Sequence, residues 1–258
     1  MSEYINLRGH QIFNYEWANN GEPLVLLHGG LSYSEKIESF LLPAVMDSHH
    51  VFAYDRTGHG RTGNQDGSIH FQFQTEELIA YLEDIVQGPA HLIGVSDGGN
   101  IALMCAIQRP DLVISVVTIG ANSHFDQVRI DFQTPLISQE EIDEHMLLSP
   151  DPIAELQVKI MKAFEVWQSE PNLSPYELAR ISCPTLILAG DDDVISASAA
   201  NEMYESIENG RLAIVPGSSH SVIKEKTDLV QHIIRDFYLN LGYPITRDPV
   251  KRRLIETV

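Results

Sequence analysis

Three residues of this sequence carry side chains that together could catalyse a reaction: a serine, an aspartate and a histidine. Ser96 lies in Gly-Val-Ser-Asp-Gly, which has the pattern G-x-S-x-G, Asp193 is the last residue of Gly-Asp-Asp-Asp, and His220 ends Pro-Gly-Ser-Ser-His. A serine hydroxyl is a poor nucleophile until a general base takes its proton, and a further group must orient that base. This set of residues therefore suits attack of a serine on a carbonyl carbon.

The stretch around Ser96 predicts a sharp turn between a strand and a helix. The apolar run 91–93 precedes it, and the helix-compatible segment 100–108 follows. Gly94 and Gly98 remove side chains that would crowd such a turn, and glycine tolerates a strained backbone. The serine hydroxyl would then lie at the N-terminal end of a helix, which favours negative charge. A turn rich in glycine and serine but without chemistry is the alternative.

The elements that must position these residues follow an α/β rhythm. Apolar runs that suit strands buried on both faces alternate with segments of helical periodicity, which predicts a mostly parallel, doubly wound sheet. The expected strands are 23–27, 51–54, 91–93, 113–119, 184–189 and 211–215, the expected helices are about 75–86, 100–108, 196–207 and 227–241, and residues 4–17 predict an antiparallel hairpin at one edge of the sheet.

The rhythm breaks between Ser123 and Ser182, where helical periodicity continues without a strand-like run. Ser-Gln-Glu-Glu from Ser138 resembles a helix start. The residues expected to share one helical face are Ile153, Leu156, Ile160, Phe164 and Trp167. We therefore expect a small helical cap, inserted after the sixth strand, over the edge of the sheet where ligands bind in such folds. The predicted division is a core of 1–122 and 183–242, a cap of 123–182 and a C-terminal tail of 243–258.

Each chemically interesting stretch follows a predicted strand. His-Gly-Gly starts at His28, the elbow contains Ser96, and Asp193 and His220 each lie in a loop after a later strand. The carboxyl ends of parallel strands meet at one edge of a sheet, so these loops should lie together. Their joint occurrence in this order disfavours the turn without chemistry.

Composition narrows the classes of function. The chain has 17 basic and 36 acidic side chains, for a net charge of −19, which disfavours binding to nucleic acid or to an anionic membrane surface. The first residues lack the features of a signal peptide, and Cys105 and Cys183 lie in apolar settings that suit buried thiols. There is no dinucleotide-binding fingerprint or metal-ligand spacing. We therefore expect a cytoplasmic protein without a cofactor or metal that acts on a small molecule; its oligomeric state stays open.

The chain resembles enzymes of the α/β-hydrolase fold from Tyr4 to Leu241. The residues that carry the resemblance are the His-Gly-Gly loop, the stretch Asp-Arg-Thr-Gly-His-Gly-Arg-Thr over 55–62, the elbow Gly-Val-Ser-Asp-Gly-Gly, and the loops Gly-Asp-Asp-Asp and Ser-Ser-His. The Ser-Asp-Gly-Gly form of the elbow, together with Ile-Gly-Ala-Asn around Gly120, is most similar to the biphenyl-hydrolase-like branch, which includes amino-acid ester hydrolases. The chain departs at Gly30, where many relatives have a larger residue, and this leaves the acyl pocket less defined.

The resemblance implies a role for each matching residue. Ser96 is the expected nucleophile and His220 the general base. The Gly-Asp-x-Asp pattern of the family favours Asp193 over Asp191 and Asp192 as the residue that orients the histidine. Some relatives carry this acid after the preceding strand, but that position is an asparagine here, which has no charge.

The oxyanion would be held by the N–H groups of Asp97 and Gly30, with Leu31 as an alternative to Gly30. Candidate substrate-binding residues are Leu31, Asn122 and Trp167. Phe164 and Met161 could also line the pocket, although core packing explains them equally well. His28, His59 and the loop that starts at Asp55 are expected to shape the site rather than to react.

Asp97 stands beside the nucleophile and invites two interpretations. Its carboxylate could pair with an ammonium group of a substrate and repel anionic acyl groups. Alternatively, it could cap the helix that follows the elbow.

The expected function is a serine hydrolase of small carboxylic esters that works through an acyl-enzyme. The alternatives are hydrolysis of a C–C, lactone or amide bond by the same triad, or a ligand-binding receptor that turns over slowly.

Overall fold

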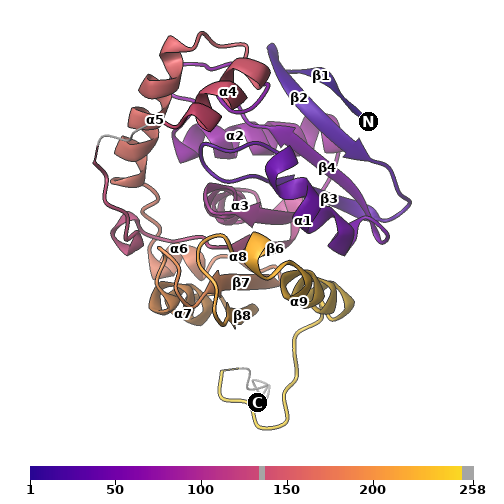
Figure 1. Cartoon of the computed structure of the whole chain (residues 1–258). Coiled ribbons are helices and arrows are strands. Elements are labelled where there is room, and N and C mark those ends of the chain that lie inside the picture. The colour runs from indigo at the N-terminus through magenta and orange to yellow at the C-terminus, as the bar shows by residue number, and fades with distance from the viewer. Residues whose placement is uncertain (134–136, 252–258) are drawn as a thin grey trace.

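The computed structural model describes residues 1–133 and 137–251, and their fold is that of an α/β protein (Figure 1). The strands are β1 (Ser2–Leu7), β2 (His10–Trp17), β3 (Glu22–Leu27), β4 (His49–Asp55), β5 (Ala90–Val95), β6 (Val113–Ile119), β7 (Thr185–Gly190) and β8 (Gly210–Val215). The α-helices are α1 (Glu35–Val45), α2 (Phe71–Tyr81), α3 (Asp97–Gln108), α4 (Gln139–Leu148), α5 (Ala154–Trp167), α6 (Pro175–Leu178), α7 (Ala197–Ser206), α8 (Val222–Glu225) and α9 (Thr227–Leu239).

The strands form one sheet in the order β1-β2-β4-β3-β5-β6-β7-β8. β1 and β2 form an antiparallel hairpin at one edge, β2 also pairs antiparallel with β4, and all the later pairs are parallel. The predicted fold class, a mostly parallel sheet with helices inserted after the sixth strand, is confirmed. Because β3 to β8 run in the same direction, the loops after them open at one edge.

Helices cover both faces of the sheet, as the unbroken apolar runs of the central strands require. One core lies between the sheet and the helices α2, α3 and α7, and it includes Ala163 and Val166 of α5. The other core lies between the sheet and the helices α1, α8 and α9. Leu26 and Leu27, which are neighbours on β3, belong to opposite cores, so the strand is buried on both faces.

The structure corrects several sequence-based boundaries. Helix α1 was not predicted; its sequence contains Pro43, which lacks an N–H group and weakens a helical pattern. The helix expected at about 75–86 begins at Phe71 and continues after Tyr81 as a single π-helical turn over Leu82–Val86. The closing helix ends at Leu239, two residues before the expected position.

The helices between β6 and β7 are α4, α5 and α6, and Figure 1 shows α4 and α5 together at one side of the molecule. Ser138 caps α4 as predicted, because its hydroxyl accepts from the N–H of Glu141 while the carboxylate of Glu141 accepts from Ser138. The expected apolar face of α5 is only partly right. Ile153 precedes the helix and is 47% exposed, whereas the buried residues of α5 include Ile160, Ala163 and Val166. The exact limits of the cap, 123 and 182, stay a prediction.

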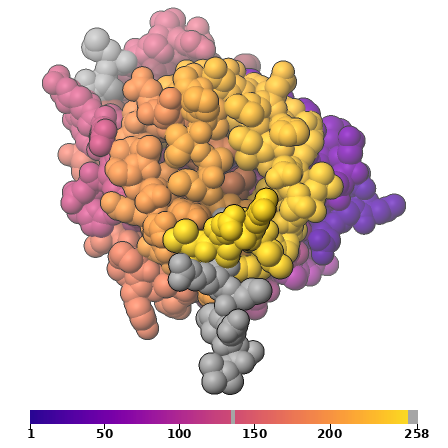
Figure 2. Space-filling view, turned by 90° about the horizontal axis from the view of Figure 1, so that it is seen from below, coloured from indigo at the N-terminus to yellow at the C-terminus, as the bar shows by residue number. Residues whose placement is uncertain are grey.

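The first part of the C-terminal tail lies on the core. Figure 2 shows the yellow chain running across the orange surface formed by the preceding elements. The ammonium group of Lys251 donates to the carbonyl of Ile207 at 2.9 Å, and Arg211 donates to the carbonyl of Gly242 at 2.6 Å. The tail was predicted over 243–258, and residues 252–258 of that prediction lie outside the described residues.

Both cysteines are free thiols; Cys105 is buried and Cys183 is partly buried. Burial raises the pKa of Cys105 to about 12 and that of Cys183 to about 11. Both groups are therefore neutral thiols near pH 7, in line with the sequence-based interpretation. Over residues 1–133 and 137–251, no helix has both the length and the apolar character needed to cross a membrane.

Candidate active site

Ser96 occupies the tight turn between β5 and α3. Its backbone has φ 51° and ψ −120°, a conformation that L-residues rarely adopt. A Cβ atom on Gly94 would lie 2.2 Å from the carbonyl of Gly98, and one on Gly98 would lie 2.4 Å from the carbonyl oxygen of Leu27. Only glycine fits at these two positions, so the predicted reason for the G-x-S-x-G spacing is confirmed.

The structure brings Ser96, His220 and Asp193 into one hydrogen-bonded series. His220 Nε2 lies 3.1 Å from Ser96 Oγ, and His220 Nδ1 lies 2.7 Å from Asp193 Oδ1. The carboxylate can only accept, so the network assigns the proton to Nδ1 and leaves Nε2 free to accept the serine proton. This is the arrangement in which a histidine can act as a general base.

The three aspartates after β7 have different surroundings. The side chain of Asp193 is fully buried and its Oδ1 also accepts from the N–H of Ile195 at 3.0 Å. Asp191 is exposed and accepts from the N–H of Ser218, and Asp192 is exposed. Of the three side chains, Asp193 is the one that contacts His220.

The loop after β3 lies against the elbow. A Cβ atom on Gly29 would lie 3.5 Å from Ser96 Cβ, and Leu31 has a positive φ of 50°, which is strained for a branched residue. The N–H groups of Gly30 and Asp97 donate to no other residue in the described part of the chain. The N–H of Asp97 also interacts with its own carboxylate, and the role of the two donors as an oxyanion hole stays a prediction.

Asp97 contacts the cap. It is buried, and its Oδ2 accepts a hydrogen bond from Trp167 Nε1 of α5 at 3.0 Å. A Cβ atom on Gly30 would lie 2.2 Å from Asp97 Oδ2 and 2.5 Å from the Trp167 ring. Our expectation that Gly30 leaves the pocket less defined is therefore corrected: the volume of a larger side chain is filled by Asp97 and Trp167. Of the two interpretations of Asp97, capping of α3 is not the main contact, because the hydrogen bond that this carboxylate accepts from another residue comes from Trp167.

Asn122 is held by protein partners. Its side-chain carbonyl accepts from Asn100 Nδ2 at 3.0 Å, its backbone N–H donates to Asn100 Oδ1 at 3.0 Å, and its amide nitrogen donates to the carbonyl of His124 at 2.9 Å. These bonds join α3 to the loop after β6. A contact of Asn122 with substrate stays a prediction, and both polar atoms of its side chain are already used.

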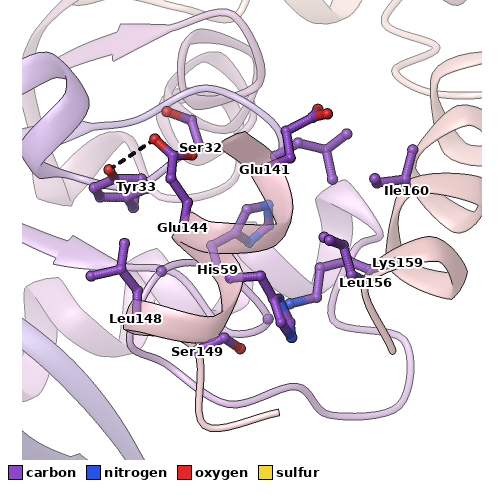
Figure 3. Close-up of a pocket in the computed structure, with 14 residues that line it drawn as sticks. Ser32, Tyr33, His59, Glu141, Glu144, Leu148, Ser149, Leu156, Lys159 and Ile160 are labelled. Carbon is purple, nitrogen blue, oxygen red and sulfur yellow. Dashed lines mark hydrogen bonds between the residues drawn. The ribbon is translucent and has the colours of Figure 1, made fainter. Parts of the chain in front are cut away.

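A cavity of about 80 Å³ lies under the cap, beside Leu31 (Figure 3). Its lining comes from the loops after β3 and β4 and from the cap helices α4 and α5. Lys159 of α5 reaches into it beside His59 and pairs with Asp151 at 3.4 Å. At the α4 side, Tyr33 donates to Glu144 at 3.4 Å. Sequence patterning gave no sign of this cavity, because its walls come from four separate segments.

Carboxylates fix the conformation of the loop after β4, which was expected to shape the site rather than to react. Asp55 accepts from the N–H groups of Ser34 at 2.9 Å and Arg61 at 3.0 Å. Gly58 and Gly60 have positive φ angles of 80° and 50°. These contacts fix the loop beside the cavity.

Glu77 of α2 is hydrogen-bonded to the same loop, and it gives a testable dependence of the protein's stability on pH. It accepts from the N–H of Thr57, and burial raises its pKa from 4.5 to about 7. Because the unfolded carboxyl ionises near 4.5, wild-type stability is lost as the pH rises through this window. Glu77→Gln has no such loss. We expect its free energy of unfolding, relative to wild type, to rise by about 2 kcal/mol between pH 5.5 and 8.

Urea unfolding at several pH values measures this difference. Glu76→Gln is the matched control, because Glu76 is exposed on the same helix. Its stability relative to wild type should change little across the window. A difference for Glu77→Gln that is independent of pH would contradict the assignment.

Within the described ranges, no group of three or more His, Cys, Asp or Glu side chains is arranged to hold a metal ion. The geometry of the site consists of a hydrogen-bonded serine, histidine and aspartate, two N–H groups that donate to no other described residue, and a cap that contacts the elbow through Trp167.

Comparisons with known proteins support the same fold and class. A model described as "Alpha/beta hydrolase family" matches residues 24–230. The (E)-2-((N-methylformamido)methylene)succinate hydrolase of Acinetobacter baylyi is 26% identical over 261 residues, covering 86% of this chain and 92% of that protein. A non-heme haloperoxidase of Rhodococcus erythropolis is 27% identical over 273 residues, covering 89% of this chain and 96% of that protein.

A solved structure shares the architecture. The serine hydrolase involved in carbazole degradation, the CarC enzyme, superposes with a TM-score of 0.77 at 22% identity, covering 93% of this chain and 98% of that one. The names of the relatives differ in the reaction, so they establish the family and leave the substrate open. With the matched model extending across the sheet and through most of the helices, the chain belongs to the alpha/beta hydrolase family.

Proposed function

We propose that this protein is a serine hydrolase that cleaves small carboxylic esters through an acyl-enzyme. The observation that supports this most is the series from Ser96 Oγ to His220 Nε2 at 3.1 Å and from His220 Nδ1 to Asp193 at 2.7 Å. No other hydroxyl in the described residues is hydrogen-bonded to a histidine that in turn meets a carboxylate at the carboxyl edge of the sheet.

In this proposal, Ser96 Oγ attacks the ester carbonyl carbon while His220 Nε2 takes the hydroxyl proton. The carbonyl oxygen becomes an oxyanion, which accepts from the N–H groups of Gly30 and Asp97. When the intermediate collapses, the C–O bond to the alcohol breaks and His220 delivers the proton to the leaving oxygen. A water molecule, deprotonated by the same histidine, then attacks the acyl-enzyme and releases the acid. Asp193 keeps the imidazole oriented and stabilises its protonated form.

A test uses a panel of p-nitrophenyl esters, from acetyl to octanoyl together with valyl, in stopped-flow and steady-state assays. We expect a burst of p-nitrophenol equal to the enzyme concentration, followed by turnover, and an acyl adduct on Ser96 in the mass spectrum of the quenched protein. If neither turnover nor a burst occurs with any ester, ester hydrolysis is wrong. Cleavage of a C–C, lactone or amide bond, or slow-turnover ligand binding, then becomes the better proposal.

The carboxylate of Asp97 supports a preference within this class. It is buried next to the nucleophile, and only one of its oxygens accepts from Trp167. An acyl group with an ammonium at its α carbon would be attracted to this charge, and an anionic acyl group would be repelled. The proposed substrates therefore have a cationic or neutral acyl part.

Asp97→Asn tests this preference. We expect a loss in kcat/KM of roughly tenfold or more for valyl esters, and a much smaller loss for the matched isovaleryl esters, because only the former carry a positive charge. The measurement is the ratio of kcat/KM for the valyl ester to kcat/KM for the isovaleryl ester, taken once for wild type and once for Asp97→Asn. Equal losses on both series would leave Asp97 with a packing role only.

A further inference from the structure

Arg56 is a buried arginine that lacks an ion pair. It follows β4 directly and its relative exposure is 0%. No carboxylate in the described part of the chain lies within 4.0 Å of its guanidinium, and its Nε and Nη1 atoms have no hydrogen-bond partner there. An unpaired buried charge is costly, because water no longer solvates it. We therefore infer that Arg56 has a role other than packing.

The polar contacts of the guanidinium lie at the loop after β3, where Nη2 is also 3.2 Å from His28 Nδ1. Arg56 Nη2 donates to the carbonyl oxygen of Gly29 at 2.9 Å. His28 contacts the same oxygen through Nδ1 at 2.8 Å, and its Nε2 accepts from the backbone N–H of Arg56 at 3.1 Å. Since Nε2 accepts, the network assigns the proton of this neutral imidazole to Nδ1. The Gly29 carbonyl thus accepts two hydrogen bonds, one of them from a cation.

That carbonyl belongs to the peptide unit whose N–H is the proposed oxyanion donor. In a trans peptide the C=O of one residue and the N–H of the next point in opposite directions. With the oxygen of Gly29 held by Arg56 and His28, the N–H of Gly30 is directed to the other side of the loop. A cationic donor on the oxygen also draws electron density from the nitrogen, which makes the N–H a better donor.

The neighbouring carboxylates of the described residues do not form an ion pair with Arg56. Burial lowers the pKa of Arg56, and the charges of Asp97 and Glu77 oppose this shift, but each of these carboxylates has its own nearer partner, Trp167 and Thr57 respectively. The guanidinium therefore keeps its hydrogen bond to the Gly29 carbonyl. Gly29 itself packs on Ser96, where a Cβ atom would lie 3.5 Å from the serine Cβ. The held peptide is thus adjacent to the nucleophile.

We propose that Arg56 is a positioning residue that orients and polarises the Gly29–Gly30 peptide for oxyanion binding. This inference rests on the proposed serine hydrolase function. Arg56 does not touch the substrate. It acts on the tetrahedral intermediate through the peptide, so its loss lowers kcat and leaves ground-state binding almost unchanged.

The experiment compares Arg56→Lys, which keeps charge and donor, Arg56→Gln, which keeps a donor without charge, and Arg56→Met, which has neither. Rates are measured per active site, by burst titration, so that loss of folded protein does not enter. We expect kcat to fall by about 100-fold in Arg56→Met and about 30-fold in Arg56→Gln, but less than about fivefold in Arg56→Lys. KM should stay within about twofold of wild type throughout.

A second readout is the affinity for an alkyl boronic acid, which forms a tetrahedral adduct with the serine. Its Kd should rise by the same factor as kcat falls in each variant. Arg61→Met is the matched control, since Arg61 lies in the same loop but contacts Tyr15 and Glu35, and its kcat should match that of wild type.

The outcomes separate this inference from the proposed function. If wild type shows no Ser96-dependent turnover, the function fails before Arg56 is tested. If wild type is active and Arg56→Gln and Arg56→Lys have the same kcat, the charge has no role and the inference is overturned. It is also overturned if KM alone rises or if boronate affinity is unchanged. The comparison of Arg56→Lys with Arg56→Gln decides the matter even where Arg56→Met does not fold.

Discussion

Ser96→Ala is expected to lower kcat on the p-nitrophenyl esters by at least about 10⁴-fold, which in most assays is complete loss. Alanine removes the only atom that can form the acyl-enzyme, while the strained backbone of the elbow accepts its methyl group as it accepts that of serine. In related chemistry, loss of the nucleophile costs about as much as loss of the whole triad. Steady-state rates and the burst amplitude measure the effect.

Two further measurements make this result specific. The thermal unfolding midpoint of Ser96→Ala should match that of wild type, because among the described residues the Ser96 hydroxyl is hydrogen-bonded to His220 alone. A fluorophosphonate should add to the wild-type protein at Ser96 and fail to add to the variant. Residual turnover above about one part in a thousand, with intact folding, would show that another group carries the reaction.

Asp193→Asn is expected to have the second largest effect, a loss of about 10³- to 10⁴-fold in kcat. An amide can present its NH₂ group to His220 Nδ1, so that the proton of the neutral ring moves to Nε2 and the base no longer accepts from Ser96. Asp193 Oδ2 is buried without a hydrogen-bond partner among the described residues, so the amide also finds few other contacts. KM should change much less than kcat.

Asp192→Asn is the matched control for this change. It removes one negative charge from the same loop, yet Asp192 is exposed and far less constrained than its neighbour. Its kcat should stay within about threefold of wild type. Comparable losses in the two variants would mean that the loop charge matters, rather than the contact of Asp193 with His220.

The sequence allowed the positions of the strands along the chain and the loops that follow them to be predicted, because those features depend on short-range patterns. The apolar runs of β3 to β8 are nearly continuous, and the glycines around Ser96 have a single steric explanation. The histidine and aspartate loops follow their strands directly. Each of these is a local property of five to ten residues.

The features that escaped prediction depend on pairs of residues far apart in the chain. The hydrogen bond from Trp167 to Asp97 spans 70 positions, and the role of Gly30 is visible only once both are placed against it. Arg56 was assigned to loop shaping, since no sequence pattern indicates that its guanidinium meets the Gly29 carbonyl. Helix α1 was missed for a local reason, the proline within it.

The contact among Gly30, Asp97 and Trp167 also constrains how this protein could be re-engineered. The three residues come from the core loop, the elbow helix and the cap, so none of them can change size alone. A cap transplanted from a relative with a smaller residue at position 167 would leave a hole beside the nucleophile, whereas a larger residue at position 30 would need room from both of the others. Exchange of caps in this chain should therefore succeed when positions 30 and 97 are exchanged together with the cap, and evolution faces the same three-way restriction.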